Sequence, residues 1–516
     1  MAELNRQPQP RANLPARLGA IFLVIVYAVV MVSTNARFTL IDDESNIIAN
    51  SGHPALETLR LYLAGAGMHD LHPPTTDILL HFWLAATHDS FFALRIFANI
   101  FFIAAVLLIA RCAGKLAGPR AWWAALILGF VWPFAFQYGR ITGWYCYSMF
   151  LIAWVTSSYL QVLDDRGYGS WILLGIASLL LVLSNYFGLI VLILLLADFL
   201  LFHRDLARRR IWPLLAVMAI VVAAFAPLLS IVFQDVSAWA TPLAARMDWK
   251  NEFAMAAYPA FSIFASAAIA PWFLPLSVPV ALAVLALFVC IWFSPGRRWL
   301  VYYVLSMVAL DLFGHMSIKR VLFLLPWLFM AMALAAASSA SRFPRLAFGA
   351  LAVIVVCGWV GIISGKHYAT TNLYEPWDKV AAVVAPDARH GATIVSGNPA
   401  FLLYLNYQLD LQSDTATASG AYLGDDVYRA HGYTILLPDA VEQPQALHGK
   451  VVLANGSGYI GEVDDQNAIN SALAARCQAL GAYRAAPDPA AIWKQRFAKD
   501  VPLLAYRTEV FWYDCP

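Results

Sequence analysis

Residues 18–54 read LGAIFLVIVYAVVMVSTNARFTLIDDESNIIANSGHP, an apolar run followed closely by three consecutive carboxylates. A helix of roughly 20 apolar residues is long enough to cross the hydrocarbon core of a bilayer. Similar runs recur along the chain as far as about residue 365. The sequence therefore predicts an all-α polytopic membrane domain, with acidic residues placed where the chain leaves its first span.

The composition supports this class of protein. The 516 residues are 61% hydrophobic and only 13% charged, whereas soluble domains carry about 25% charged residues. The net charge of +2 and the lack of a basic patch with interleaved aromatic residues exclude nucleic acid as an expected partner. No small-residue cleavage site follows the first apolar segment, so we expect it to be retained as a helix.

Loop charges orient the predicted spans, because short cytoplasmic loops are enriched in Lys and Arg. Placing the basic N-terminal tail inside gives a first span at about 17–34 and a second at 92–110. The apolar segment 77–87 is too short to cross the core and is predicted to lie along the membrane surface. The cytoplasmic segments then hold about fifteen Lys and Arg residues against about eight outside. This threading predicts about 11 spans, up to 13, with an external C-terminus.

The composition changes after residue 365. An amphipathic helix, a short β run (ATIVSG) and further apolar strands at 435–438 and 450–454 predict a small extracytoplasmic α/β domain over 366–516. Residues 1–365 form the predicted transmembrane domain. Cys477 and Cys515 fall in the C-terminal domain, and the sequence leaves open whether they form a disulfide. None of the six cysteines has the spacing of a metal site.

The predicted external side collects the residues that carry chemistry. Carboxylates there are suited to activate an acceptor, and cations are suited to hold a phosphate. The candidates are Asp42, Asp43, Glu44, Asp70, His72, Arg95, Arg140, Tyr145, His315, Lys319 and Arg320.

Two stretches carry a family resemblance. DDESNIIANSGHP and HPPTTDILLHFWLAATHDSFFALRIFANIF resemble membrane glycosyltransferases of the GT-C class. More narrowly they resemble the protein O-mannosyltransferase-like family, whose bacterial relatives include the lipid A aminoarabinose transferase. SNYFGLIVLILLLA (184–197) is similar to the family's Ser/Thr-His-Tyr-Phe segment, and IKRVLFLLPWL (318–328) to its Arg-Tyr-Leu-Leu-Pro-x-x-Pro segment. The resemblance covers about 35–200 and 315–340.

The resemblance implies a GT-C fold with membrane-surface helices in the first external loop, at about 35–90. It also implies an inverting transferase that uses a polyprenyl-phosphate-linked sugar and a hydroxyl acceptor on a glycan, lipid or protein. Asp43 would be the general base, because Asp43-Glu44 matches the family's Asp-Glu pair. Glu44 would either orient Asp43 or act as a first-turn acid of the following helix.

The sequence departs from the family's pattern at several positions. The family's phosphate cation before the proline is sometimes Lys, whereas His72 stands here. Arg140 has no acid beside it as relatives often have, and Val321 instead of Tyr follows Arg320.

The implied reaction needs no resident cofactor, and a divalent metal is possible but not implied. The implied location is a bacterial inner membrane, with the N-terminus cytoplasmic. Two other functions stay open at this stage: a transporter or flippase of lipid-linked glycans, and a catalytically inactive relative. The scarcity of ionisable residues in the middle of the predicted spans disfavours transport. The sequence distinguishes neither the sugar nor the acceptor, nor the oligomeric state. Asp198, near the cytoplasmic end of a span, is predicted to be structural.

Overall fold

A computed structural model gives the fold of the chain. It describes residues 14–35, 42–64, 72–87, 91–164, 167–233, 249–314 without 267 and 270, 319–364, and 377–516 without 397–400, 402–403, 406–426, 431–432, 437–446, 457–459 and 485–507. Within these ranges the side chains of Asp42, Asp43 and Lys319 lie outside the description.

The membrane domain is built from helices. In chain order they are α1 (Leu14–Asn35), α2 (Asp42–Ser51), α3 (Ala55–Ala64), α4 (Thr75–Thr87), α5 (Phe91–Ala117), α6 (Pro119–Val131), α7 (Pro133–Tyr138), α8 (Trp144–Leu163), α9 (Tyr168–Val182), α10 (Gly188–Phe202), α11 (Arg204–Arg209) and α12 (Ile211–Phe225). They continue with η1 (Ala226–Leu228), α14 (Trp249–Ala265), α15 (Leu274–Trp292), α16 (Arg297–Gly314), η2 (Lys319–Leu324), α17 (Leu325–Ala337) and α18 (Pro344–Ser364). Prolines open α6, α7 and α18, where a missing N–H costs no hydrogen bond.

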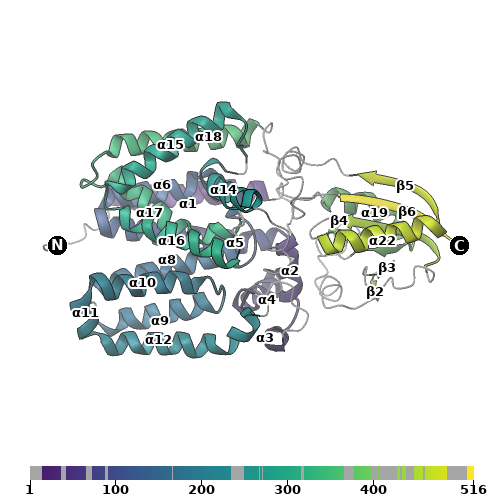
Figure 1. The fold of residues 1–516 in the computed structure, drawn as a ribbon, viewed down its shortest axis with the longest axis horizontal. Helices are drawn as coiled ribbons and strands as arrows, with labels where there is room; N and C mark the ends of the chain where they lie inside the picture. The colour runs from purple at the N-terminus through teal and green to yellow at the C-terminus, as the bar shows by residue number, and fades with distance from the viewer. Residues whose placement is uncertain are drawn as a thin grey trace.

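The long helices run side by side, and the short helices gather at their two ends (Figure 1). Helices α2, α3 and α4 lie at the end nearer the C-terminal sheet, which we call the α2 end. Helix α11 lies at the opposite end, which we call the α11 end. The described loops before α8 and before α10 are both at the α2 end, as the predicted threading requires.

The predicted fold class is confirmed. Seven of the described helices are long and apolar enough to cross a membrane, and four shorter apolar helices accompany them. The predicted count of about 11 spans stays a prediction. Helix α4 covers the segment expected at the membrane surface and has only 13 residues, too few to cross the hydrocarbon core.

At the α11 end, the buried carboxylate of Asp198 links several helices. The carboxylate of Asp198 on α10 accepts hydrogen bonds from the hydroxyls of Tyr159 and Tyr302 and pairs with Arg298 on α16. The Arg298 Nε also donates to the Tyr302 hydroxyl at 2.8 Å. The ion pair with Arg298 and the two tyrosine hydroxyls offset the cost of burying the Asp198 charge, and the cluster joins α8, α10 and α16.

The C-terminal domain is a six-stranded sheet with helices on both faces. Its elements are α19 (Trp377–Arg389), β1 (Thr393–Val395), β2 (Val427–Ala430), β3 (Tyr433–Leu436), β4 (Gly449–Gly456), α22 (Ile460–Arg476), β5 (Gln478–Arg484) and β6 (Thr508–Cys515). The strand order is β2-β3-β1-β4-β6-β5. β1 pairs in parallel with β3 and β4, and the other neighbours pair antiparallel.

The two faces of this sheet have separate cores. Val380 and Val384 of α19 pack on Ile394 and Val452, whereas Leu473 of α22 packs in a second cluster on the opposite face. The sequence prediction included α19, β1, β3 and β4 but missed β2, β5, β6 and α22. β5 reads QALGAYR, and its small residues lack the β-branched pattern from which a strand is recognised.

Cys477 and Cys515 form a disulfide, with their Cα atoms 4.4 Å apart. The bond ties the end of α22 to the end of β6. It answers the question that the sequence left open about this pair.

We predict that Cys477→Ser destabilises the C-terminal domain. The bond closes a 38-residue separation, and restricting an unfolded loop of that size stabilises the folded state by about 4 kcal/mol. Thermal unfolding of the purified protein, with and without reductant, measures this. Reductant should lower the unfolding temperature of the wild type but not that of Cys477→Ser, and equal responses would contradict the prediction.

Candidate active site

The first turn of α2 contains a buried ion pair. The Glu44 side chain is fully buried, and its Oε1 accepts from the Arg95 Nη1 on α5 at 2.5 Å. The same oxygen accepts from the backbone N–H of Thr142 at 2.7 Å. Arg95 Nη1 also donates to the carbonyl oxygen of Arg140 at 2.9 Å. These contacts fix α2 against α5 and against the loop that precedes α8.

Arg140 is buried in that loop and donates to several protein acceptors. Its Nε donates to the Phe136 carbonyl at 3.0 Å, and its Nη1 donates to the Thr34 hydroxyl at 3.0 Å. Burial away from water lowers the pKa of the guanidinium to about 9, which leaves it protonated at neutral pH. Arg140 therefore connects the end of α1 to the loop before α8.

A glycine permits the close approach of α2 to α8. Gly143 has φ +136°, a conformation that a side chain rarely adopts. A Cβ at this position would lie 2.5 Å from the Ile47 Cδ1 of α2. The Gly-Trp-Tyr sequence at 143–145 thus sets both the start of α8 and the position of α2.

His72 lies at the centre of an aromatic stack. Its ring centroid is 4.1 Å from that of Trp144 and 5.2 Å from that of Tyr186. Thr75, three residues later, anchors the same turn because its backbone N–H and hydroxyl both donate to the Leu183 carbonyl, at 3.3 and 2.5 Å. The His-Pro-Pro segment is therefore docked between the start of α8 and the loop joining α9 to α10.

The segment IKRVLFLLPWL (318–328), which also carries the family resemblance, lies near the Trp144 ring, as does His72. Phe323 of η2 lies 6.0 Å from Trp144, measured between ring centroids. Trp144 in turn lies 4.0 Å from the ring of Tyr145. Arg320, in the same 3-10 helix, is half-buried. Trp144 thus lies against two parts of the sequence far from its own, the His72 segment and η2.

Several polar side-chain atoms at the α2 end are buried without a hydrogen-bond partner among the described atoms. Four of them are Asn50 Nδ2, Thr76 Oγ1, Trp144 Nε1 and Asn185 Nδ2. Unpaired buried polar atoms are rare and destabilising unless a ligand or water satisfies them. The Trp144 ring packs against His72, Thr76 lies four residues after His72, and Asn185 precedes Tyr186, whose ring packs on the His72 ring. Sequence reasoning missed all four, because nothing in their spacing marks them.

The structure places the predicted site residues as follows. Glu44, His72, Arg95, Arg140, Tyr145 and Arg320 are described and lie in the segments that meet at the α2 end. The backbones of Asp42 and Asp43 form the first turn of α2, and the backbone of Lys319 begins η2. Asp70 and His315 lie outside the described residues. The catalytic and binding roles of all these residues stay predictions.

Glu44 and Arg95 hold α2 against α5 and the loop before α8, a structural contact that the sequence did not predict. From the sequence we expected Glu44 to orient Asp43 or to be a first-turn acid of its helix. We expected Arg95 to be a phosphate ligand. In the structure they bind each other. Among the described residues, no group of three His, Cys, Asp or Glu side chains is arranged to hold a metal ion.

Comparisons with known proteins agree with this arrangement. Residues 71–231 match the family described as Dolichyl-phosphate-mannose-protein mannosyltransferase. The fold is similar to the crystal structure of ArnT from Cupriavidus metallidurans in the apo state, with a TM-score of 0.54 and 12% identity over 96% of this chain and 98% of that chain. ArnT bound to undecaprenyl phosphate gives a TM-score of 0.54 and 13% identity over the same shares. No curated protein sequence matches the chain. The family match over residues 71–231 confirms the resemblance to the GT-C protein O-mannosyltransferase-like family for that part of the chain, and the fold is similar to that of ArnT.

We predict that Glu44→Gln strongly destabilises the α2 end. The amide can still accept from the Thr142 N–H, but Arg95 loses its buried counter-charge, which typically costs about 3–5 kcal/mol. Thermal unfolding in detergent measures the effect. The double variant Glu44→Gln/Arg95→Met should be more stable than Glu44→Gln alone, since no unpaired charge remains. A single variant as stable as the wild type would contradict the prediction.

Proposed function

We propose that this chain, a relative of the protein O-mannosyltransferase-like GT-C glycosyltransferases, moves a sugar from a polyprenyl-phosphate carrier to a hydroxyl acceptor. One observation carries the proposal. The acidic segment, the His-Pro-Pro turn, the Ser-Asn-Tyr-Phe loop and η2 are far apart in sequence yet meet at one end of the helices, around Trp144 and Glu44. These are the segments that carry the resemblance. The structure of ArnT with undecaprenyl phosphate supports a carrier of that chemical class.

In the proposed reaction, Asp43 takes the proton of the acceptor hydroxyl as its oxygen attacks the anomeric carbon. The bond from that carbon to the phosphate oxygen breaks, and polyprenyl phosphate leaves as a stable anion. Attack from the opposite side inverts the configuration at this carbon. Only one carboxylate is needed, since the leaving group requires counter-charge and no proton. Glu44 and Arg95 would act by holding the backbone of Asp43 in place.

The carrier's phosphate would be held by cations and by neutral hydrogen-bond donors. We assign the cationic part to Lys319 and Arg320, together with His72 and with His315, which precedes them in the sequence. The unpaired donors on Trp144, Thr76 and Asn185 support a ligand rich in acceptor oxygens, such as a phosphate or a sugar. Asp42, Asp70 and Tyr145 are proposed to contact the sugar or the acceptor. No cofactor is required by this chemistry, and dependence on a divalent metal is left to experiment.

The proposed location of the site is the extracytoplasmic face of a bacterial inner membrane. The arginines of α11 support this orientation, because positive residues favour the cytoplasmic side. The disulfide in the C-terminal domain supports it as well, since such bonds persist in oxidising compartments. The acceptor would be a glycan, lipid or protein hydroxyl that approaches from the aqueous side, next to the C-terminal domain.

We predict that Asp43→Asn abolishes transfer while the protein remains folded. Removing a general base lowers rates by about 10²–10⁴-fold. The assay follows loss of a radiolabelled polyprenyl-phosphate sugar in membranes, with thermal unfolding as the folding check. Asp205→Asn, on the exposed surface of α11, is the matched control and should retain wild-type activity. Full activity of Asp43→Asn would remove the assignment.

We also predict that Trp144→Phe weakens binding of the carrier without preventing the reaction. The change keeps an aromatic ring next to His72 but removes the indole N–H together with the rest of the five-membered ring. Loss of one hydrogen bond should raise the KM for the donor about tenfold. Trp212→Phe, an exposed tryptophan at the α11 end, should leave KM unchanged. An unaltered KM in Trp144→Phe would show that this N–H does not face the donor.

A further inference from the structure

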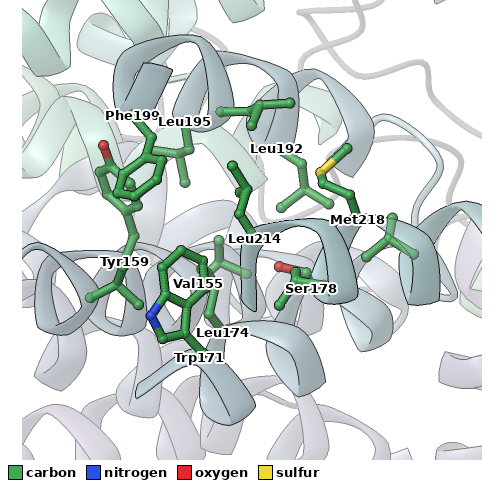
Figure 2. Close-up of a pocket in the computed structure, with 14 residues that line it drawn as sticks. Val155, Tyr159, Trp171, Leu174, Ser178, Leu192, Leu195, Phe199, Leu214 and Met218 are labelled. Atoms are coloured by element: carbon green, nitrogen blue, oxygen red, sulfur yellow. The ribbon is translucent and has the colours of Figure 1, made fainter. Parts of the chain in front are cut away.

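A cavity of about 50 Å³ lies inside the group formed by α8, α9, α10 and α12. Figure 2 shows side chains from these helices pointing into it, among them Trp171, Leu174, Phe199 and Met218. It lies near the middle of α9, α10 and α12, because its lining residues begin at least three positions from either end of each helix. The cavity therefore sits within the membrane-spanning part of the protein.

The cavity is unsuited to water. The polar groups of its lining side chains are the Tyr159 and Ser178 hydroxyls and the Trp171 indole N–H, and the Tyr159 hydroxyl already donates to Asp198. A buried water needs two to four polar partners. A hydrocarbon chain needs none, and it gains from contact with the surrounding apolar side chains.

The cavity is closed toward the α2 end. Tyr62 of α3, which is fully buried, packs there with Val182, Phe225 and Leu228. Val221, which lines the cavity, belongs to the same cluster. This packed layer separates the cavity from the His72 stack at the α2 end. A chain end that occupies the cavity is therefore expected to enter from the other direction.

The opposite end is rich in positive charge. Arg204, Arg208 and Arg209 are exposed on α11, and the Arg210 guanidinium lies 5.4 Å from the ring centroid of Tyr168. One acid, Asp205, lies among them. Arg210 precedes the cavity-lining Leu214 by four residues, which is about 6 Å along a helix. Arg298 is not part of this group, because Asp198 neutralises it.

Aromatic side chains mark the membrane surface beside these arginines. Trp212 is 78% exposed, Phe202 70% and Tyr168 66%. Trp and Tyr are enriched where a membrane protein passes from hydrocarbon to head groups. The arginines of α11 therefore lie at the level of lipid head groups, directly beyond the cavity.

We propose that this is a binding site for an anionic diacyl phospholipid of the adjacent leaflet. The arginines of α11 bind its phosphate-containing head group, and the end of one acyl chain fills the cavity between α9, α10 and α12. The charge of α11 selects an anionic lipid over a zwitterionic one. The site is separate from the proposed active site and does not depend on the transferase activity. A polyprenyl carrier is the competing occupant, but it would have to pass the Tyr62 cluster.

Lipid binding to the purified, delipidated protein tests the proposal. Native mass spectrometry would measure affinities for dioleoyl phosphatidylglycerol, dioleoyl phosphatidylcholine and undecaprenyl phosphate. The head-group variant is Arg208→Gln/Arg209→Gln, with Arg345→Gln as the matched control at an exposed arginine elsewhere. The cavity variant is Ser178→Phe, with Ile193→Phe on the exposed face of α10 as its control.

We expect the wild type to bind phosphatidylglycerol about tenfold more tightly than phosphatidylcholine. The double arginine variant should lose this preference, and Ser178→Phe should weaken both phospholipids about tenfold, while both controls behave as the wild type. The arginine variant changes only exposed residues and keeps the test decisive if Ser178→Phe folds poorly. Equal binding of the two phospholipids to the wild type would overturn the proposal. So would a Ser178→Phe effect confined to undecaprenyl phosphate.

Discussion

The buried ion pair between Glu44 and Arg95 is the constraint on which the α2 end of this protein depends. Removing two charges from water is costly, and their attraction offsets the cost only when every remaining hydrogen-bonding group is also paired. Here the Thr142 N–H and the Arg140 carbonyl complete the pair. The loop before α8 must therefore stay in place for α2 to stay in place. Asp43, the neighbour of Glu44 in the chain, lies in the first turn of a helix that is held against α5 and against the loop before α8.

Ionisable and polar side chains gather at both ends of the membrane domain. Ionisable side chains are expensive within hydrocarbon, so they collect near the ends of the helices. At the α11 end, Asp198 is satisfied by two tyrosines and an arginine, and the polar cluster is closed within the protein. At the α2 end, donors on Trp144 and Asn185 are left without protein partners. His203 Nε2, beside Asp198 at the α11 end, is likewise buried without a hydrogen-bond partner among the described atoms, so a polar ligand at the α2 end stays a proposal.

Much of the fold was predictable from local properties of the sequence. The length of the apolar runs predicted the helical membrane domain, and the shortness of 77–87 predicted that α4 does not cross it. Alternating helix and strand patterns predicted the core of the C-terminal sheet. The prediction failed at β5 and β6, which add antiparallel strands to one edge. Their pairing depends on β4, far away in sequence, and the Gly- and Ala-rich β5 carries no strong signal of its own.

For the candidate site, the sequence by itself predicted which segments carry chemistry and that they share one side of the membrane. Hydrophobic length and loop charge are local, so they can be read along the chain. Only the tertiary structure decided which side chains meet. Glu44 and Arg95 are 51 residues apart, and the rings of His72, Trp144 and Tyr186 come from three separate segments. No periodicity encodes such contacts, because they arise when distant helices pack and each buried polar group must find a partner.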